Sequence, residues 1–318
     1  MKNKNIFITG IAGFIGFHLS YFLLKKKYNV YGIDNLNSYY SKKLKIKRLS
    51  ILKKYKNFHF KKLSLGNYPI LRKTIRVSNA DIIINLAAQP GVRFSFIKPE
   101  QYIDYNIKGF FNILRSMEEL KLKKLIYASS SSIYGDALKF PTLENSKQKS
   151  INLYGLTKTI NENLAELYSR MSKINSFGLR FFTAYGSLGR PDMFIDKILN
   201  SIKNKKKIYL YNRGKHTRDF THVSNVVEII FELIKKINTY EGSNIFNVCS
   251  SRRVSVLKLI QKIEKYKRTK IPTKKIGKQK GDMLDTYGSN KKILKFLNKK
   301  INFLDLDDGL KETIFKKI

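Results

Sequence analysis

The stretch NIFITGIAGFIG, Asn5 to Gly16, joins a short apolar strand to a glycine-rich turn and the beginning of a helix. The helix after the turn is indicated by apolar residues at helical spacing, namely Ile15, Leu19, Phe22 and Leu23. Glycines at positions 10, 13 and 16 would permit a tight turn, a close approach of the backbone to a pyrophosphate and close packing of the helix. A glycine triplet alone is weak evidence, but its strand–turn–helix context predicts a dinucleotide-binding loop.

An acid at the end of the next predicted strand indicates which dinucleotide binds. Asp34 closes the apolar stretch NVYGID, near the spacing expected for a carboxylate that binds the adenosine ribose. A carboxylate accepts hydrogen bonds from a free 2′-hydroxyl and repels a 2′-phosphate. We therefore expect NAD as the cofactor in preference to NADP.

The first half of the chain alternates predicted strands with predicted helices. The strands are NIFITG, NVYGID, FHFKKL, the almost continuously apolar DIIINLAA, and KLIYASSSS, which ends in hydroxyls. Between them, SKKLKIKRLSILKKY is expected to form a basic amphipathic helix and YIDYNIKGFFNILRSMEEL a longer one. This order predicts an α/β protein with a Rossmann-type, doubly wound parallel sheet covered by helices on both faces.

The pattern changes after residue 150. A helix predicted over residues 152–171 carries an apolar stripe made of Leu153, Leu156, Ile160, Leu164 and Leu167. The strand SFGLRF follows it, and then shorter elements are mixed with loops. We expect a NAD-binding domain over residues 1–175, with residues 215–250 contributing in part, and a smaller mixed α/β substrate domain over residues 176–318. The cleft between them is the expected site.

Composition narrows the function classes. The chain has 318 residues, 63 Lys and Arg against 23 Asp and Glu, and a formal net charge of +40. Such an excess suits nucleic acid or an anionic membrane surface, but the lysines are spread along the whole chain and no nucleic-acid-binding motif accompanies them. We interpret them as a solvated basic surface, with no specific nucleic acid and no membrane insertion. The single cysteine, Cys249, excludes an internal disulfide and fits a cytoplasmic protein. The glycines near the N-terminus argue against a signal peptide.

The sequence YGLTK places a tyrosine and a lysine, Tyr154 and Lys158, one turn apart on the predicted helix after residue 150. Both lie off the leucine stripe, so packing of that stripe does not account for them. A phenol has a pKa of about 10 and is a poor base at neutral pH, but a nearby ammonium favours the phenolate. The pair suits acid–base chemistry, although in a chain rich in lysine the spacing alone decides nothing.

Read together, these motifs resemble the extended short-chain dehydrogenases/reductases, and within them the NAD-dependent sugar-nucleotide epimerases. The matches extend almost from end to end and include GIAGFIGFHL, NLAAQPGVRFS, YNIKGFFNIL, YASSSSIYG, YGLTK, GLRFFTAYG and RDFTHV. More discriminating are DNLNSYY with a downstream LK, PGVRFS and GRPDM, which look like UDP-glucuronate 4-epimerases.

The resemblance implies a set of site residues. It makes Tyr154 the acid/base, Lys158 its electrostatic partner and Ser130 the third catalytic residue, with Ser131 or Ser132 as alternatives in the serine run. The implied cofactor-binding residues are Gly10, Gly13, Phe14, Ile15, Gly16, Asp34, Asn35, Asn37, Ser38, Ser64, Leu65, Leu86, Ala87, Ala88, Gln89, Asn106, Ser129, Tyr154 and Lys158. The implied UDP-sugar-binding residues are Arg93, Ser130, Ser131, Tyr154, Thr183, Arg190, Arg218, Gln279 and Asp282. No metal is expected.

The resemblance also implies the reaction, a 4-epimerisation through a transient 4-keto sugar. Related dehydratases carry an Asp–Glu pair directly after the catalytic hydroxyl, and UDP-glucuronate decarboxylases carry a Glu there. Here the positions are Ser131 and Ser132, which favours an epimerase that interconverts UDP-glucuronate and UDP-galacturonate for a surface polysaccharide. A homodimer is implied as well. A neutral UDP-hexose or UDP-N-acetylhexosamine as the substrate, and a non-catalytic NAD-binding protein with a basic nucleic-acid-binding surface, remain the alternatives.

Some segments depart from the family pattern. Ser64 stands where an acid usually contacts adenine. SNVV stands where two acids are common, and KQKGDM stands where a proline usually precedes Gly-Asp. These departures concern nucleotide contacts and leave the proposed chemistry unchanged.

Overall fold

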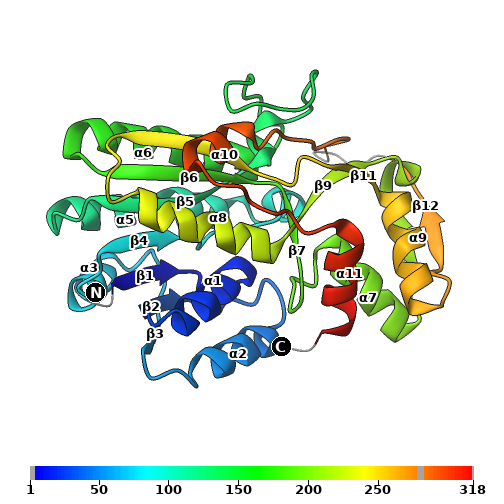
Figure 1. Cartoon of the computed structure of the whole chain (residues 1–318), viewed down its shortest axis with the longest axis horizontal. Helices are drawn as coiled ribbons and strands as arrows, with labels where there is room; N and C mark the ends of the chain where they lie inside the picture. Colours follow the sequence, from blue (N-terminus) through cyan, green and yellow to red (C-terminus); the bar gives the residue numbers. More distant parts are fainter. Residues whose placement is uncertain (1–3, 278–282, 317–318) are drawn as a thin grey trace.

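The computed structural model describes residues 4–277 and 283–316. Its largest element is a sheet of seven parallel strands in the order β10-β6-β5-β4-β1-β2-β3 (Figure 1). The strands are β1 Asn5–Thr9, β2 Asn29–Asp34, β3 Phe58–Lys62, β4 Ile82–Asn85, β5 Lys124–Ser130, β6 Asn175–Phe181 and β10 Ser243–Val248. The predicted Rossmann-type fold is confirmed, and all five strands expected in the first half of the chain are present.

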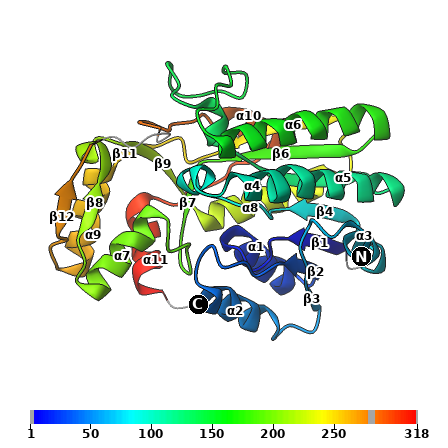
Figure 2. The same ribbon diagram turned by 180° about the vertical axis from the view of Figure 1, so that it is seen from behind.

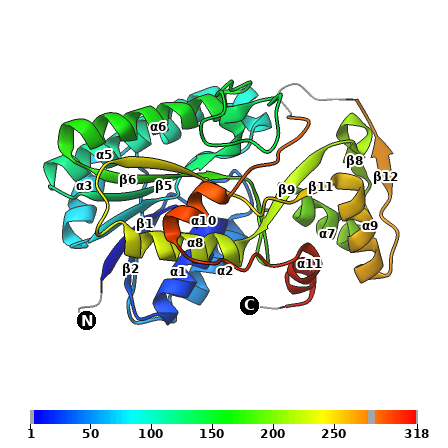
Figure 3. The same cartoon turned by 45° about the horizontal axis from the view of Figure 1, so that its top comes forward.

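Helices cover both faces of this sheet because each face is apolar. On one face, the core between the sheet and its helices contains Ile6, Ile8 and Ile84. Its helices are α1 Phe14–Lys25, α2 Lys42–Leu52, α8 Val223–Lys236 and α10 Lys291–Leu297. On the other face, Phe7, Ile83 and Leu125 pack against a second set of helices. These are α3 Tyr68–Val77, α5 Gly109–Glu119 and α6 Leu153–Ser172, and Figure 3 shows the two layers on either side of the strands.

The remainder of the chain forms a smaller region beside the carboxyl ends of the strands, and Figure 2 shows it from behind. Its three-stranded sheet has the order β11-β9-β7 and its two-stranded sheet pairs β12 with β8. Its elements are β7 Thr183–Tyr185, α7 Phe194–Asn204, β8 Ile208–Leu210, β9 Thr217–His222, β11 Arg253–Ser255, α9 Val256–Lys267, β12 Thr273–Lys275 and α11 Leu306–Phe315. Short 3-10 turns complete the chain at η1 Arg93–Phe96, η3 Ser131–Tyr134 and η4 Tyr211–Gly214.

Two features differ from the expected domain organisation and helices. The predicted boundary at residue 175 falls at the first residue of β6, which pairs with β5 and β10 in the large sheet. The helix predicted as YIDYNIKGFFNILRSMEEL is a succession of α4 Pro99–Tyr102, the π-helix η2 Ile103–Lys108 and α5.

The apolar stripe predicted on α6 is only partly covered, and Leu164 packs against the core beside the sheet. Leu156 is 47% exposed and Leu167 is 43% exposed. The buried face carries small and polar residues instead, among them Gly155, Thr157, Lys158, Asn161, Glu162 and Ala165. Lys158 therefore lies in the interior, whereas two leucines of the stripe are exposed.

The predicted basic helix α2 is present and buries one face, made of Lys45, Arg48, Leu49 and Leu52, so two of its cations lie in the interior. Ile46, by contrast, is 57% exposed. Among the residues that the structure describes, no helix is long and apolar enough to cross a membrane.

Candidate active site

A cavity of about 400 Å³ lies at the carboxyl ends of the parallel strands. It is lined by the loops after β1, β2, β3, β4 and β5, by the start of α6 and by the segment around β7. The sheet order reverses between β1 and β4, and in open parallel sheets ligands bind at such a switch point. The fold therefore places this cavity where a dinucleotide would bind.

The glycine loop is held against its neighbours so closely that side chains would not fit. Gly10 has a φ of +68°, and a Cβ there would lie 2.8 Å from the Cα of Ala87, at the end of β4. A Cβ on Gly16 would lie 2.3 Å from the carbonyl oxygen of Gly10, which is too close for any side chain. The first turn of α1 thus packs directly on the loop and exposes its N-terminus to the cavity, as pyrophosphate binding requires.

Asp34 lies at the end of β2 and is buried. Its carboxylate accepts hydrogen bonds from Ala12 N at 3.1 Å and from Leu36 N at 2.8 Å, so it also braces the glycine loop. Burial raises the pKa of Asp34, while the nearby Lys45 ammonium lowers it. Lys45 lines the cavity and donates to the Asn37 side-chain oxygen at 2.8 Å. These residues fit the adenosine ribose of NAD.

Asn106 and Gln89 shape the cavity from outside its lining. Gln89 N donates to the Asn106 side-chain oxygen at 2.7 Å, and Asn106 Nδ2 donates to the Gln89 carbonyl at 3.1 Å. Asn106 Nδ2 also donates to Thr157 Oγ1 at 3.1 Å, which ties the π-helix η2 to α6. Asn106 therefore fixes the loop after β4, whose residues line the cavity. Asn106 belongs to the π-helix η2, and π-helical turns are frequent at functional sites.

The three predicted catalytic residues meet in the cavity. Ser130 ends β5 and is hydrogen-bonded to the Tyr154 side chain, while its Oγ also accepts from Ser132 N at 3.1 Å. Lys158 Nζ lies 5.9 Å from the centre of the Tyr154 ring and donates to the Ala128 carbonyl at 2.8 Å. Of the four consecutive serines, Ser130 is thus the one bonded to the tyrosine.

The protonation states of Tyr154 and Lys158 depend on their burial and on neighbouring groups. Burial raises the pKa of Tyr154, whereas the Arg190 guanidinium and the hydrogen bond with Ser130 lower it. The lowering that the sequence attributes to Lys158 thus comes from Arg190 and Ser130 in this structure. Burial lowers the pKa of Lys158 to about 8, against a raising effect of Glu162.

Two arginines, Arg190 and Arg218, also line the cavity. Arg190 pairs with Asp192 through two hydrogen bonds, Nε to Oδ1 at 3.0 Å and Nη2 to Oδ2 at 2.5 Å. Tyr39 also donates to Asp192, at 3.0 Å, so one carboxylate positions both side chains. Arg218 is held by backbone carbonyls of Thr217, Met283 and Leu284 at 2.8–2.9 Å. Thr183 begins β7 on the same wall. Guanidinium and hydroxyl donors at these positions suit an anionic sugar nucleotide.

Most of the predicted site residues meet in this cavity. Those that line it are Gly10, Gly13, Phe14, Ile15, Gly16, Asp34, Asn35, Asn37, Ser64, Leu65, Leu86, Ala87, Ala88, Ser129, Ser130, Ser131, Tyr154, Lys158, Thr183, Arg190 and Arg218. Gln89, Asn106, the exposed Ser38 and Arg93 lie outside the lining, and the Arg93 guanidinium stacks on the ring of Tyr211 at 4.0 Å. Gln279 and Asp282 lie outside the described residues.

The sequence did not single out two buried cations of α2, Lys45 and Arg48. Arg48 is fully buried and donates to the Ala12 carbonyl at 2.8 Å in the glycine loop. It also donates to the carbonyls of Leu188 and Gly189, directly before Arg190. Arg48 therefore links the glycine loop to the loop that precedes Arg190. The LK motif and the basic residue three positions after its lysine are visible in the sequence, but nothing in the sequence distinguishes them from the many surface lysines.

Comparisons with known proteins agree with this geometry. The model of the family described as "NAD dependent epimerase/dehydratase family" matches residues 6–249. An uncharacterised protein of Methanocaldococcus jannaschii is 43% identical over 98% of this chain and 95% of its own length. The UDP-glucuronate 4-epimerase of Thermodesulfobacterium geofontis is 33% identical over 96% of this chain and 94% of its own length.

Among solved structures, a similar one is that of UDP-glucuronic acid 4-epimerase from Bacillus cereus in complex with UDP-glucuronic acid and NAD. It has a TM-score of 0.91 and 29% sequence identity, and the match covers 97% of each chain.

Proposed function

Because this chain belongs to the NAD-dependent epimerase/dehydratase family, we propose that it is an NAD-dependent 4-epimerase that interconverts UDP-glucuronate and UDP-galacturonate. The observation that carries the proposal is the meeting of Ser130, Tyr154 and Lys158 with the glycine loop and Arg190 in one cavity. The relatives with this name support the choice of substrate.

In the proposed reaction, Tyr154 removes the proton from the sugar 4-hydroxyl and later returns it. Ser130 is hydrogen-bonded to Tyr154 and lines the same cavity. In the proposed reaction it orients the sugar 4-hydroxyl. NAD held by the glycine loop and Asp34 would supply the hydride chemistry: it would accept the C4 hydride and give it back to the other face of the sugar, with no net oxidation. The Arg190 guanidinium and the hydrogen bond with Ser130 favour the phenolate form of Tyr154, which brings a weak base closer to its working range. Lys158 is the proposed electrostatic partner of Tyr154 when NAD is bound.

The uronate carboxylate must be held firmly, because a 4-keto uronate is a β-keto acid and loses CO₂ readily. We assign this task to Thr183, Arg190 and the Ser131 hydroxyl, which line the sugar end of the cavity. Ser131 and Ser132 stand where related decarboxylases carry a Glu. Among the described residues that line the cavity, Asp34 is the one carboxylate, and it lies at the adenosine end. This arrangement favours epimerisation over decarboxylation.

The assembly that we propose is a homodimer formed through α5 and α6. Their outward faces carry apolar side chains that this chain does not cover: Phe111, Leu156, Leu167 and Met171 are between 39% and 69% exposed. Burying such side chains against a second copy would remove them from water. Light scattering after size-exclusion chromatography measures the mass directly. We further propose a cytoplasmic enzyme that supplies a precursor for a surface polysaccharide.

A panel of UDP-sugars tests the substrate assignment. Purified protein should convert UDP-glucuronate to a product of identical mass that separates from it as UDP-galacturonate. If UDP-pentose forms mainly, the enzyme is a decarboxylase; if UDP-glucose or UDP-N-acetylglucosamine is turned over faster, the enzyme is a neutral-sugar epimerase. Either outcome overturns the proposal.

A further inference from the structure

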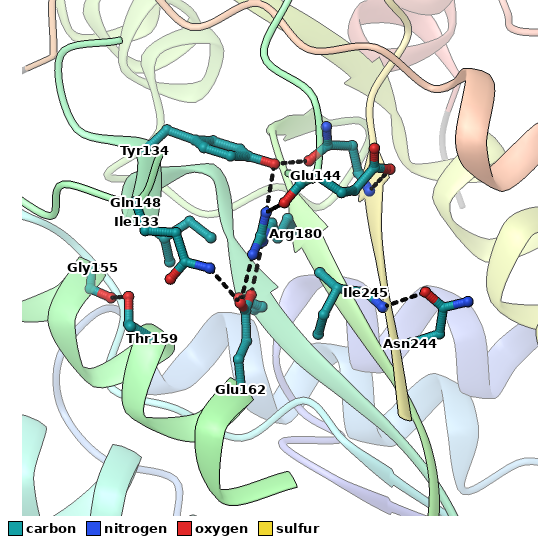
Figure 4. Close-up of polar contacts among 12 residues, drawn as sticks. Ile133, Tyr134, Glu144, Gln148, Gly155, Thr159, Glu162, Arg180, Asn244 and Ile245 are labelled. Carbon is teal, nitrogen blue, oxygen red and sulfur yellow. Dashed lines mark hydrogen bonds and ion pairs between the residues drawn. The ribbon is translucent and has the colours of Figure 1, made fainter. Parts of the chain in front are cut away.

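A buried ion pair lies behind the catalytic residues. Glu162 of α6 and Arg180 of β6 are 6% and 2% exposed. Arg180 donates to Glu162 through Nε at 2.9 Å and through Nη2 at 2.7 Å. Figure 4 shows the pair, with the Tyr134 hydroxyl accepting from the other side of the guanidinium at 2.8 Å. The guanidinium therefore fixes the position of the Glu162 carboxylate.

This carboxylate is connected directly to the catalytic strand. Ser129 Oγ donates to Glu162 Oε1 at 2.5 Å, and Ser129 lies between Ala128 and the predicted catalytic Ser130. The preceding residue, Ala128, accepts the hydrogen bond from Lys158 Nζ. Consecutive residues of β5 are thus each bonded to α6, one by Lys158 and one by Glu162. Because these two positions are four apart, both side chains project from the same face of the helix.

Glu162 also acts on Lys158 through its charge. Lys158 is 1% exposed, and burial disfavours its ammonium form. The negative charge of Glu162 opposes that effect. In the proposed chemistry the Lys158 ammonium is the electrostatic partner of Tyr154, so the charge of Lys158 matters to that chemistry.

We propose that Glu162 is a positioning residue for the epimerase: held by Arg180, its carboxylate fixes the end of β5 through Ser129 and keeps Lys158 in its charged form. This inference rests on the proposed function for the roles of Tyr154 and Lys158. The carboxylate itself does not touch substrate, because it lines a second cavity, of about 800 Å³, and is absent from the lining of the first.

Several other polar and charged groups lie around the Glu162 carboxylate. Gln148 Nε2 lies 3.5 Å from Glu162 Oε2, and Arg180 also donates to the Glu144 carbonyl at 2.7 Å. The titratable and charged residues that face Glu162 or share its cavity are Lys158 and Glu166 on α6, Tyr127 on β5, Arg180 on β6, Tyr134 on η3, Glu144 on the preceding loop, and Arg170, Lys291 and Lys292 at the edge of the second cavity.

The sign of the expected change follows from these charges. Burial already brings the pKa of Lys158 down to about 8. Removing the Glu162 charge should lower it further, by about one pH unit, the size of shift that a neighbouring opposite charge produces. Activity needs the ammonium, so the loss of activity on the alkaline side should begin at a correspondingly lower pH.

The test compares Glu162→Gln with Glu166→Gln, an exposed glutamate one turn further along α6 that pairs with Arg170. The first measurement is the pH profile of kcat with UDP-glucuronate. The second is the titration of Lys158 itself, followed by NMR of lysines labelled at Cε and assigned as the signal that is missing in Lys158→Met. We expect Glu162→Gln to move both midpoints down by about one pH unit, whereas Glu166→Gln leaves both unchanged.

The lysine titration separates this inference from the proposed function, because it needs no turnover. If wild-type protein does not epimerise UDP-glucuronate, the function fails while the Lys158 midpoint still tests the charge effect. The double variant Glu162→Gln/Arg180→Gln controls for an unpaired buried guanidinium and for a single variant that does not fold. It should keep the lowered midpoint. An unchanged Lys158 midpoint in Glu162→Gln, or a return to the wild-type midpoint in the double variant, would leave Glu162 with a purely structural role.

Discussion

Replacing Arg190 by alanine should impair recognition of the uronate and proton transfer by different amounts. Arg190 lines the sugar end of the cavity, and its guanidinium lowers the pKa of Tyr154. A charged hydrogen bond contributes about 1.5–3 kcal/mol, so the loss of a contact to the carboxylate should reduce kcat/KM for UDP-glucuronate by about ten- to a hundredfold or more. A neutral UDP-hexose has no carboxylate and is spared this part of the loss.

The second part of the loss is common to every substrate. Without Arg190 the pKa of Tyr154 rises, because the larger of the two effects that oppose burial is gone and only the hydrogen bond with Ser130 is left. Below that pKa each unit of upward shift removes about a factor of ten from the phenolate fraction, equivalent to about 1.4 kcal/mol. The common loss should therefore shrink as the pH rises from about 7 toward the pKa of Lys158, about 8, above which the ammonium is lost.

The assay measures kcat/KM for UDP-glucuronate and UDP-glucose at both pH values. The ratio of the two constants should fall by about ten- to a hundredfold at either pH, while the absolute loss is smaller at the higher pH. If turnover of UDP-glucose is too slow, binding of both nucleotides can be compared by calorimetry in the Tyr154→Phe background.

Asp192→Asn is the matched control for this experiment. It removes the carboxylate that pairs with Arg190 and leaves the guanidinium in place. Because a competing anion is gone, binding of UDP-glucuronate should be retained or tightened. Equal losses for both substrates in Arg190→Ala would refute the reasoning and would assign Arg190 to the diphosphate or to loop structure.

Three further changes test other parts of the site. Tyr154→Phe should remove nearly all turnover and leave NAD and UDP-sugar binding close to normal; residual activity within tenfold of wild type, about 1.4 kcal/mol in barrier, would point to another base. Asp34→Ala should weaken NAD binding measured by calorimetry, partly through the lost bonds to Ala12 N and Leu36 N, and a tight preference of the wild type for NADP would contradict the assignment. Charge reversal of the exposed lysines should barely change turnover or unfolding temperature, and DNA binding that survives physiological salt would revive the nucleic-acid alternative; these positions are Lys203, Lys205, Lys206 and Lys207.

The sheet could be predicted because local and global signals agree along the first half of the chain. The spacing of Gly10, Gly13 and Gly16 after a strand is visible in the sequence, and three of the four buried positions of β4 are isoleucine. Alternating strands and helices then leave few topologies, since parallel crossovers are right-handed. The boundary near residue 175 was less predictable, because β6 returns to the large sheet before the chain enters the smaller region.

The orientation of α6 could not be predicted from hydropathy. The leucines suggest a core-facing stripe, yet the face against the sheet carries Lys158 and Glu162, whose charges are satisfied by β5 and β6. Burying a charge is costly unless it is paired and hydrogen-bonded, and the partners lie far away in sequence. A pattern within one helix contains no information about them.

Buried lysines and arginines could not be predicted from the sequence for the same reason: their hydrogen-bond partners lie far away in the chain. In a chain with 63 Lys and Arg, composition treats every lysine and arginine alike. Among the residues that the structure describes, however, four of them lie at 5% exposure or less: Lys45, Arg48, Lys158 and Arg180. Each donates hydrogen bonds to particular oxygen atoms of the protein: Lys45 to Asn37, Arg48 to the carbonyls of Ala12 and Leu188, Lys158 to Ala128, and Arg180 to Glu162. Because a buried cation without such acceptors would be strongly unfavourable, each of these four must form together with its partners. Exposed lysines need no such partners because water solvates them. These four, by contrast, link α2 and α6 to the glycine loop, to β5 and β6 and to the loop before Arg190.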